Sequence, residues 1–120
     1  MTKQPHPNVT SADVERVVRR DFPADRFAEV MVVLNEYGAD ESWQREADRV
    51  RLATLKLAGG SMERLRNEIG AAKADYRDVL GPAEYPGHGK RARGRKKLPP
   101  EEEQRVIDSD WKQYQDWLMR

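Results

Sequence analysis

Apolar residues recur every three or four positions through most of the chain, which is the spacing of amphipathic helices. Residues 1–9 lack this period and contain two prolines, so we expect them to form a disordered leader. A first helix is predicted to start after Thr10, which makes a capping-box pattern with Asp13. Pro23 ends this helix and suits the first turn of a second helix, which Gly38 ends. The apolar faces of the two helices consist of Val14, Val17, Val18 and Phe22, and of Phe27, Val30, Met31, Leu34 and Tyr37.

Two more helices are predicted between residues 40 and 80. Asp40 or Ser42 can cap the third, whose apolar positions cover a broad arc, so we expect it near the centre of the domain. The short turn at Gly59 and Gly60 should make the third and fourth helices antiparallel neighbours. Ser61 is expected to cap the fourth helix, and Gly81 followed by proline to end it. Their apolar positions are Trp43, Ala47, Val50, Ala53 and Leu57, and Met62, Leu65, Ile69, Ala72, Tyr76 and Val79.

A fifth helix is predicted over residues 99–120, because two prolines followed by three glutamates are typical of a helix start. Its apolar face is rich in aromatic side chains, and leaving it in water would be unfavourable. We therefore expect it to pack on the core of its own chain, with packing on another subunit as the alternative. As a candidate interaction face it consists of Trp111, Tyr114, Trp117 and Leu118.

No segment shows a strand pattern of comparable quality. The sequence predicts an all-α fold, a compact bundle of about five helices with a basic loop before the last helix. The expected organisation is a four-helix core over residues 10–86, a basic loop or linker over residues 87–98, and the C-terminal aromatic helix over residues 99–120 docking on the core.

The formal charge of +1 is distributed unevenly. Residues 1–86 contain 13 Lys+Arg against 15 Asp+Glu, and residues 99–120 contain 3 against 6. Residues 87–98 contain 6 Lys+Arg and no acid, so all of the excess positive charge lies in this stretch. Turn-forming residues and a change of charge sign bound it, which indicates a loop. Its cations are Lys90, Arg91, Arg93, Arg95, Lys96 and Lys97.

These six cations have several interpretations. The first is a solvated loop that pairs with nearby acids. The second is an arm that contacts nucleic-acid phosphates. Arg93, Gly94 and Arg95 resemble a minor-groove arm, although Lys96 stands where such arms have proline. No aromatic residue is interleaved, so base stacking is not expected. An acidic protein partner or an anionic membrane surface is the third.

The residues that usually carry chemistry are scarce. The chain has no cysteine, and its two histidines, His6 and His88, lie outside the predicted helices. Cations are interleaved with most of the carboxylate pairs, which is typical of solvated helix faces, and neither a Gly-x-Ser-x-Gly motif nor a phosphate-binding loop occurs. We therefore expect no enzyme, with no catalytic residue, metal site, cofactor or small-molecule substrate. The pairs are Asp75 with Asp78, Glu63 with Glu68, and Asp108 with Asp110.

No apolar stretch approaches the ~20 residues of a membrane span, and the first residues lack the hydrophobic segment of a secretory signal. We therefore expect a cytoplasmic protein without membrane insertion.

Two segments, KLAGGSMERLRNEIGAAKADYRDVLGPAEYP at 56–86 and DWKQYQDWLMR at 110–120, resemble a group of small, uncharacterised bacterial proteins. The resemblance covers most of the chain from about residue 22 and implies a bacterial, self-contained helical domain. It implies no activity.

Two functions are therefore expected from the sequence. The preferred one is a non-catalytic helical module for interaction or regulation, which acts through a protein partner or as a homodimer. The alternative is a nucleic-acid-binding protein that uses residues 90–97 as a phosphate-contacting arm.

Overall fold

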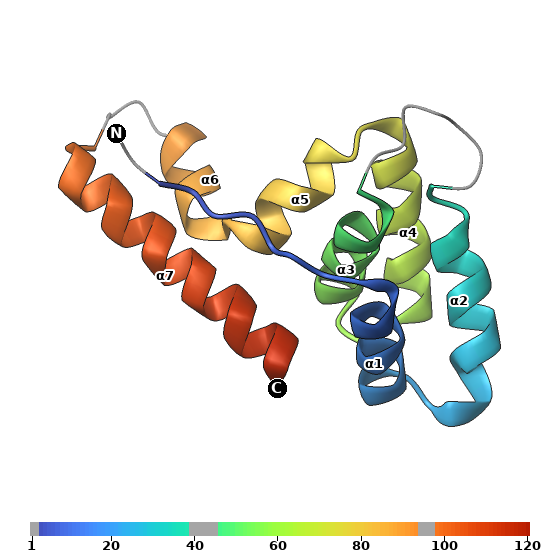
Figure 1. The fold of residues 1–120 in the computed structure, drawn as a ribbon. Helices are drawn as coiled ribbons and strands as arrows, with labels where there is room; N and C mark the ends of the chain where they lie inside the picture. The colour runs from blue at the N-terminus through green and yellow to red at the C-terminus, as the bar shows by residue number, and fades with distance from the viewer. Residues whose placement is uncertain (1–2, 39–45, 94–97) are drawn as a thin grey trace.

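Every regular element in the described residues, 3–38, 46–93 and 98–120 of the computed structural model, is a helix (Figure 1). The all-α prediction is thus confirmed for this part of the chain, which has seven α-helices rather than about five. The elements are α1 (Ser11–Asp21), a short 3-10 helix η1 (Ala24–Arg26), α2 (Phe27–Asn35), α3 (Ala47–Ala58), α4 (Met62–Ala74), α5 (Arg77–Glu84), α6 (Pro86–Arg93) and α7 (Pro100–Met119).

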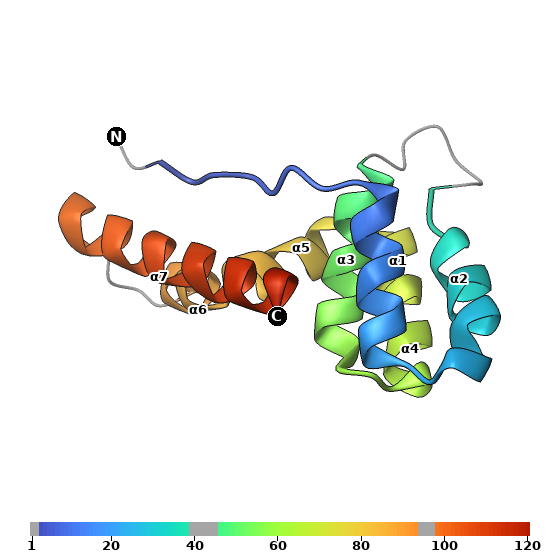
Figure 2. The same cartoon turned by 60° about the horizontal axis from the view of Figure 1, so that its bottom comes forward.

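Helices α1 to α4 form a bundle, and α3 contacts α1, α4 and α5 (Figures 1 and 2). The side chains of Leu52, Ala53 and Leu55 are fully buried, as the broad apolar arc of this helix requires. Gly59 ends α3 in the left-handed conformation that glycine favours. The start predicted at Asp40 or Ser42, including Trp43, lies outside the described residues.

The fourth predicted helix is two helices. It breaks at Asp75, whose extended backbone ends α4 and whose carboxylate accepts hydrogen bonds from the backbone and guanidinium of Arg77 at 2.9 to 3.0 Å. The apolar period continues through Tyr76 and Val79, so spacing alone did not reveal this break. Helix α5 also continues through Pro82 instead of ending before it.

Helices α5, α6 and α7 extend from one side of the bundle, which explains the elongated dimensions of 47 × 30 × 23 Å (Figure 1). The loop predicted over residues 87–98 is wrong in its first half, because α6 occupies residues 86–93. Pro86 suits the first position of a helix, and the groups that hold α6 come from α7, far along the chain. The local sequence therefore gave little indication of helix α6.

Helix α7 packs along α6 and α5, and its C-terminal end meets α1. The Arg16 guanidinium donates to the Leu118 carbonyl at 2.7 Å, and that of Arg20 donates to the Trp117 carbonyl at 2.7 Å. The last carbonyls of a helix have no partner within it, so the two arginines satisfy them and oppose the helix dipole. They fix the end of α7 on the bundle.

Residues 3–9, expected to be a disordered leader, form an extended segment that runs from α1 toward the start of α7 (Figure 2). The Lys3 N–H donates to the Gln104 side chain at 2.7 Å, and the same side chain donates to the Lys3 carbonyl at 3.0 Å. The Tyr85 hydroxyl donates to the Pro5 carbonyl, and Pro7 is buried. Distant side chains, absent from the local pattern, order this segment.

The described residues include no helix with both the length and the apolar character of a membrane span.

Replacing Tyr114 by phenylalanine tests the core beneath α7. The hydroxyl is fully buried and meets no hydrogen-bond partner among the described residues, so its removal should leave stability unchanged or raise it by up to about 1 kcal/mol. Leu118→Ala in the same cluster should instead destabilise by about 2 to 3 kcal/mol. Urea unfolding measures both changes, and a Tyr114→Phe variant that loses more than 1 kcal/mol would show that the hydroxyl is bonded.

Candidate functional site

The basic segment, defined as residues 90–97, begins in α6, which lies beside the first half of α7 on the side of the molecule away from α1 to α4 (Figures 1 and 2). Lys90, Arg91 and Arg93 belong to this helix. Arg95, Lys96 and Lys97 lie outside the described residues. The structure thus places half of the predicted cations in a helix that projects from the bundle.

A buried carboxylate on α7 holds the first turn of α6. The side chain of Asp110 is only 6% exposed and accepts the Gly87 N–H at 3.0 Å and the His88 N–H at 2.7 Å. These N–H groups have no partner within the helix, and a negative charge opposes the dipole at this end. A Cβ atom at residue 87 would lie 2.8 Å from the carboxylate, so the contact requires glycine.

A second contact joins α6 to α7 about two turns closer to the start of α7. The His88 ring nitrogen Nε2 lies 3.2 Å from Glu103 Oε1, an ion pair when the ring is protonated. Together with Asp110, this contact fixes the backbone of α6 along α7.

The predicted interaction face of α7 is used largely within the chain. Tyr114 is fully buried and Leu118 is 5% exposed, both in the hydrophobic core. The Trp117 ring is partly buried between Tyr114, at a centroid distance of 5.6 Å, and the Arg20 guanidinium, 5.2 Å from its ring. Of the four residues, Trp111 and Trp117 retain partial exposure. The face cannot serve a partner as a whole, because its centre packs against its own chain.

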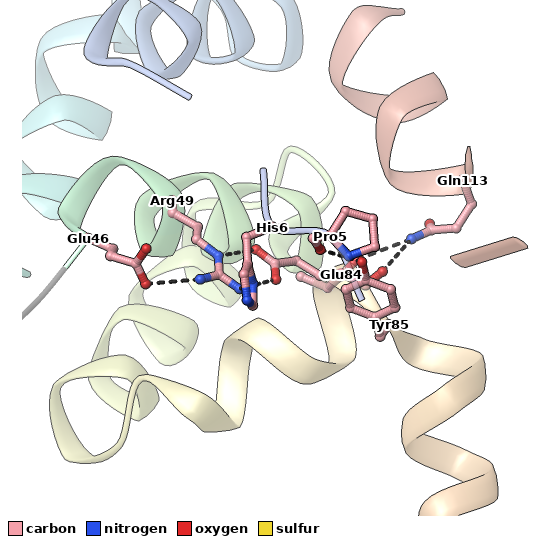
Figure 3. Close-up of polar contacts among 8 residues, drawn as sticks. Pro5, His6, Glu46, Arg49, Glu84, Tyr85 and Gln113 are labelled. Atoms are coloured by element: carbon pink, nitrogen blue, oxygen red, sulfur yellow. Dashed lines mark hydrogen bonds and ion pairs between the residues drawn. The ribbon is translucent and has the colours of Figure 1, made fainter. Parts of the chain in front are cut away.

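A buried polar junction joins the N-terminal segment, α3, α5 and α7 (Figure 3). At its centre the Arg49 guanidinium donates to both oxygens of Glu84, from Nε at 2.7 Å and from Nη2 at 2.6 Å. Glu84 is 2% exposed, and its hydrogen bond raises the pKa of Arg49. Further contacts reach Arg49 from Glu46 at 2.9 Å and from His6 Nδ1 at 3.0 Å.

Helix α7 also takes part in this junction. The Gln113 amide donates to the carbonyls of Ala83 and Glu84, both at 3.3 Å (Figure 3). Apolar spacing did not predict the junction, because Arg49 and Glu84 lie 35 positions apart and His6 and Arg49 lie 43 apart. A glutamate between alanine and tyrosine was the one local sign of burial.

The carboxylates have structural uses. Both Glu84 oxygens accept from Arg49, those of Asp110 hold α6, and the pKa of Asp75 is lowered by its hydrogen bond to Arg77. Among described residues, no three His, Asp or Glu side chains are grouped closely enough to hold a metal ion. These contacts therefore fix helices in place, and the described residues of α7 that remain partly exposed include Trp111 and Trp117.

Comparison with protein-family models, with curated proteins and with solved structures finds no match to this chain. The functional argument therefore depends on the chain's own residues.

Removing the Asp110 carboxylate should release α6. Asp110→Ala leaves two N–H groups without their charged acceptor, and we expect a loss of about 3 kcal/mol in the free energy of unfolding. Amide hydrogen exchange should become faster in α6 than in the bundle. Asp108→Ala is the matched control, since among the described residues this exposed carboxylate accepts only from Gln104, and it should change stability by less than about 0.5 kcal/mol. Equal losses in both variants would contradict the assigned role.

The Tyr85 phenol should make stability fall at alkaline pH. Burial, followed by the nearby Glu84 charge, raises the pKa of Tyr85 from 10.0 to about 12. Between these values the unfolded chain has released the proton that the folded chain still holds, so stability decreases as pH rises from about 10 to about 12. Tyrosinate absorbance should show this late titration, and Tyr85→Phe should reduce its amplitude by one tyrosine, because burial also raises the pKa of Tyr114. A Tyr85 titration complete near pH 10 would contradict the prediction.

Proposed function

We propose that the protein is a non-catalytic helical binding module, and that its basic segment contacts the phosphates of a nucleic acid. The observation that carries this proposal is the fixation of α6 on α7 by the buried carboxylate of Asp110. The backbone of a helix held in this way has less conformational entropy left to lose on binding than a free loop would have.

The composition of the segment favours phosphates over a protein surface. Protein interfaces are built around an apolar or aromatic centre, and residues 90–97 contain six cations with only alanine and glycine between them. Nucleic-acid affinity comes largely from Lys and Arg beside phosphates, for which such a run is suited.

Acidic residues elsewhere are compatible with this proposal. Near the segment, Asp110 is buried against α6 and Glu103 lies against His88, whereas Glu101 and Glu102 are exposed in the first turn of α7. On the bundle, several carboxylates already have arginine partners, including Asp13 with Arg16 and Glu29 with Arg26 and Arg66. The net negative charge of residues 1–86 therefore lies mainly on a different part of the molecule from the basic segment.

Binding to labelled duplex DNA and single-stranded RNA, followed by fluorescence anisotropy over a range of salt concentrations, tests the proposal. If all six cations neutralise duplex phosphates, log affinity should fall against log salt with a slope of about −5. Replacing all six by alanine should abolish binding while helical content is kept.

Two triple variants divide the segment. Alanine at Lys90, Arg91 and Arg93 tests the part within α6, and alanine at Arg95, Lys96 and Lys97 tests the rest. Each should reduce the slope by about half. A matched control replaces three exposed cations elsewhere and should keep both affinity and slope. These control positions are Arg64, Lys73 and Lys112. Flat binding curves, or equal loss in the control, would overturn the proposal.

A protein partner or a homodimer is the second candidate. It is favoured by the partial exposure of Trp111 and Trp117 and by Met119, which is 71% exposed on the same helix. Association through these side chains would tolerate salt, because it would depend on apolar burial. Absence of nucleic-acid binding, with a dimer mass by light scattering that persists at high salt, would favour this candidate.

A further inference from the structure

A cleft of about 680 Å³ lies where the C-terminal ends of α1, α3 and α7 come together. Its lining includes Arg20 and Asp21 from α1, Lys56 from α3, and Gln113 and Trp117 from α7. Arg120, which follows α7, also lines it. Volumes of this order hold small molecules in many proteins. The cleft adjoins the second half of α7, whereas α6 packs beside the first half.

Lys56 is the least compensated charge in this cleft. Its side chain is half-buried, and no hydrogen bond or ion pair reaches its ammonium group from the described residues. Burial lowers the pKa of Lys56, and the charge of Asp110 opposes this shift only in part. Both Asp110 oxygens already accept N–H groups of α6, so this carboxylate is not free to move to the ammonium.

The other charges of the cleft leave it positive. Arg20 and Asp21 neutralise each other through two hydrogen bonds of 2.8 and 3.2 Å. Asp116 pairs with Lys112 at 2.6 Å on the exposed side of α7. Among the described residues, no carboxylate side chain forms an ion pair with the Lys56 ammonium or with the exposed Arg120 guanidinium.

We propose that this cleft binds the phosphate or carboxylate group of a small anionic molecule, with the Lys56 ammonium as its charge partner and Arg120 at its entrance. A half-buried ammonium without a bonded counterion is unfavourable, and a bound anion would form a charge-assisted hydrogen bond in a partly desolvated site. The proposal is independent of nucleic-acid binding by the basic segment.

Thermal unfolding and amide chemical shifts, with inorganic phosphate, pyrophosphate or citrate as the probe, test the inference. Each probe is compared with sodium chloride of equal ionic strength. We expect at least one probe to raise the melting temperature beyond the chloride control and to shift the Trp117 indole signal. No effect beyond chloride from any of the three would overturn the proposal.

Lys56→Met is the decisive variant, because methionine keeps most of the apolar stem and removes the charge. Without added anion it should be at least as stable as the parent, since an uncompensated charge has been removed. Anion affinity should fall about tenfold or more, as expected for the loss of a charge-assisted hydrogen bond. Lower stability without anion, or unchanged affinity, would overturn the role of Lys56.

Two controls separate this site from other cations. Lys73→Met changes an exposed lysine on α4 and should leave the response to the anion intact. The variant with alanine at all six cations of the basic segment should also keep the response. If this six-alanine variant loses it, the anion binds the basic segment, and the cleft is not the site.

Discussion

The buried carboxylate of Glu84 constrains this structure most, because a carboxylate that is only 2% exposed needs a counterion in direct contact with it. Arg49 satisfies it with two parallel hydrogen bonds, an arrangement that the planar guanidinium allows and a lysine ammonium does not. The pair fixes α5 on α3 at one position along both helices. A buried ion pair of this kind contributes little to the free energy of unfolding, but removing one partner leaves an uncompensated buried charge and is strongly destabilising. The main effect of the pair is therefore to fix the position of α5 on α3.

The orientation of the outer helices follows from this pair. Helix α6 starts two residues after Glu84, and Gln113 of α7 donates to the carbonyl of Glu84 itself. Asp110, one turn earlier on α7, then holds α6. A basic helix and an acidic helix start are thereby kept side by side, and the position of the proposed nucleic-acid contact depends on a carboxylate in a different part of the chain.

Local signals predicted the parts of the fold that depend on local contacts. The cap at Thr10, the glycine after α3 and the apolar period of α1 all lie within a few residues of the elements they define. The break at Asp75 was missed because the apolar spacing is the same on both sides of it. Helix α6 was missed for a different reason, since its cap is supplied from 22 to 23 residues away.

The two candidate sites also differ in how far local sequence predicts them. The run of six cations is apparent from the sequence itself, whereas the helix that holds its first three is not. The cleft around Lys56 could not be predicted from the sequence, because three helices far apart in the chain form it. Nor could the sequence show that no described residue forms an ion pair with the Lys56 ammonium. Tyr114 and Leu118 were recognised as a face that must be covered, but spacing alone could not say which surface covers them.

Both ends of α7 are tied to the beginning of the chain, through Lys3 and Gln104 at 101 positions apart and through Arg16 and Leu118 at 102. During synthesis the bundle helices emerge first and can collapse on local contacts, whereas their partners on α7 are made much later. Until then the hydrogen bonds of Lys3, Arg16 and Arg20 to α7 cannot form. Docking of α7 is therefore expected to come late during synthesis, and a chain whose synthesis pauses before residue 100 lacks the helix that α5 and α6 pack against.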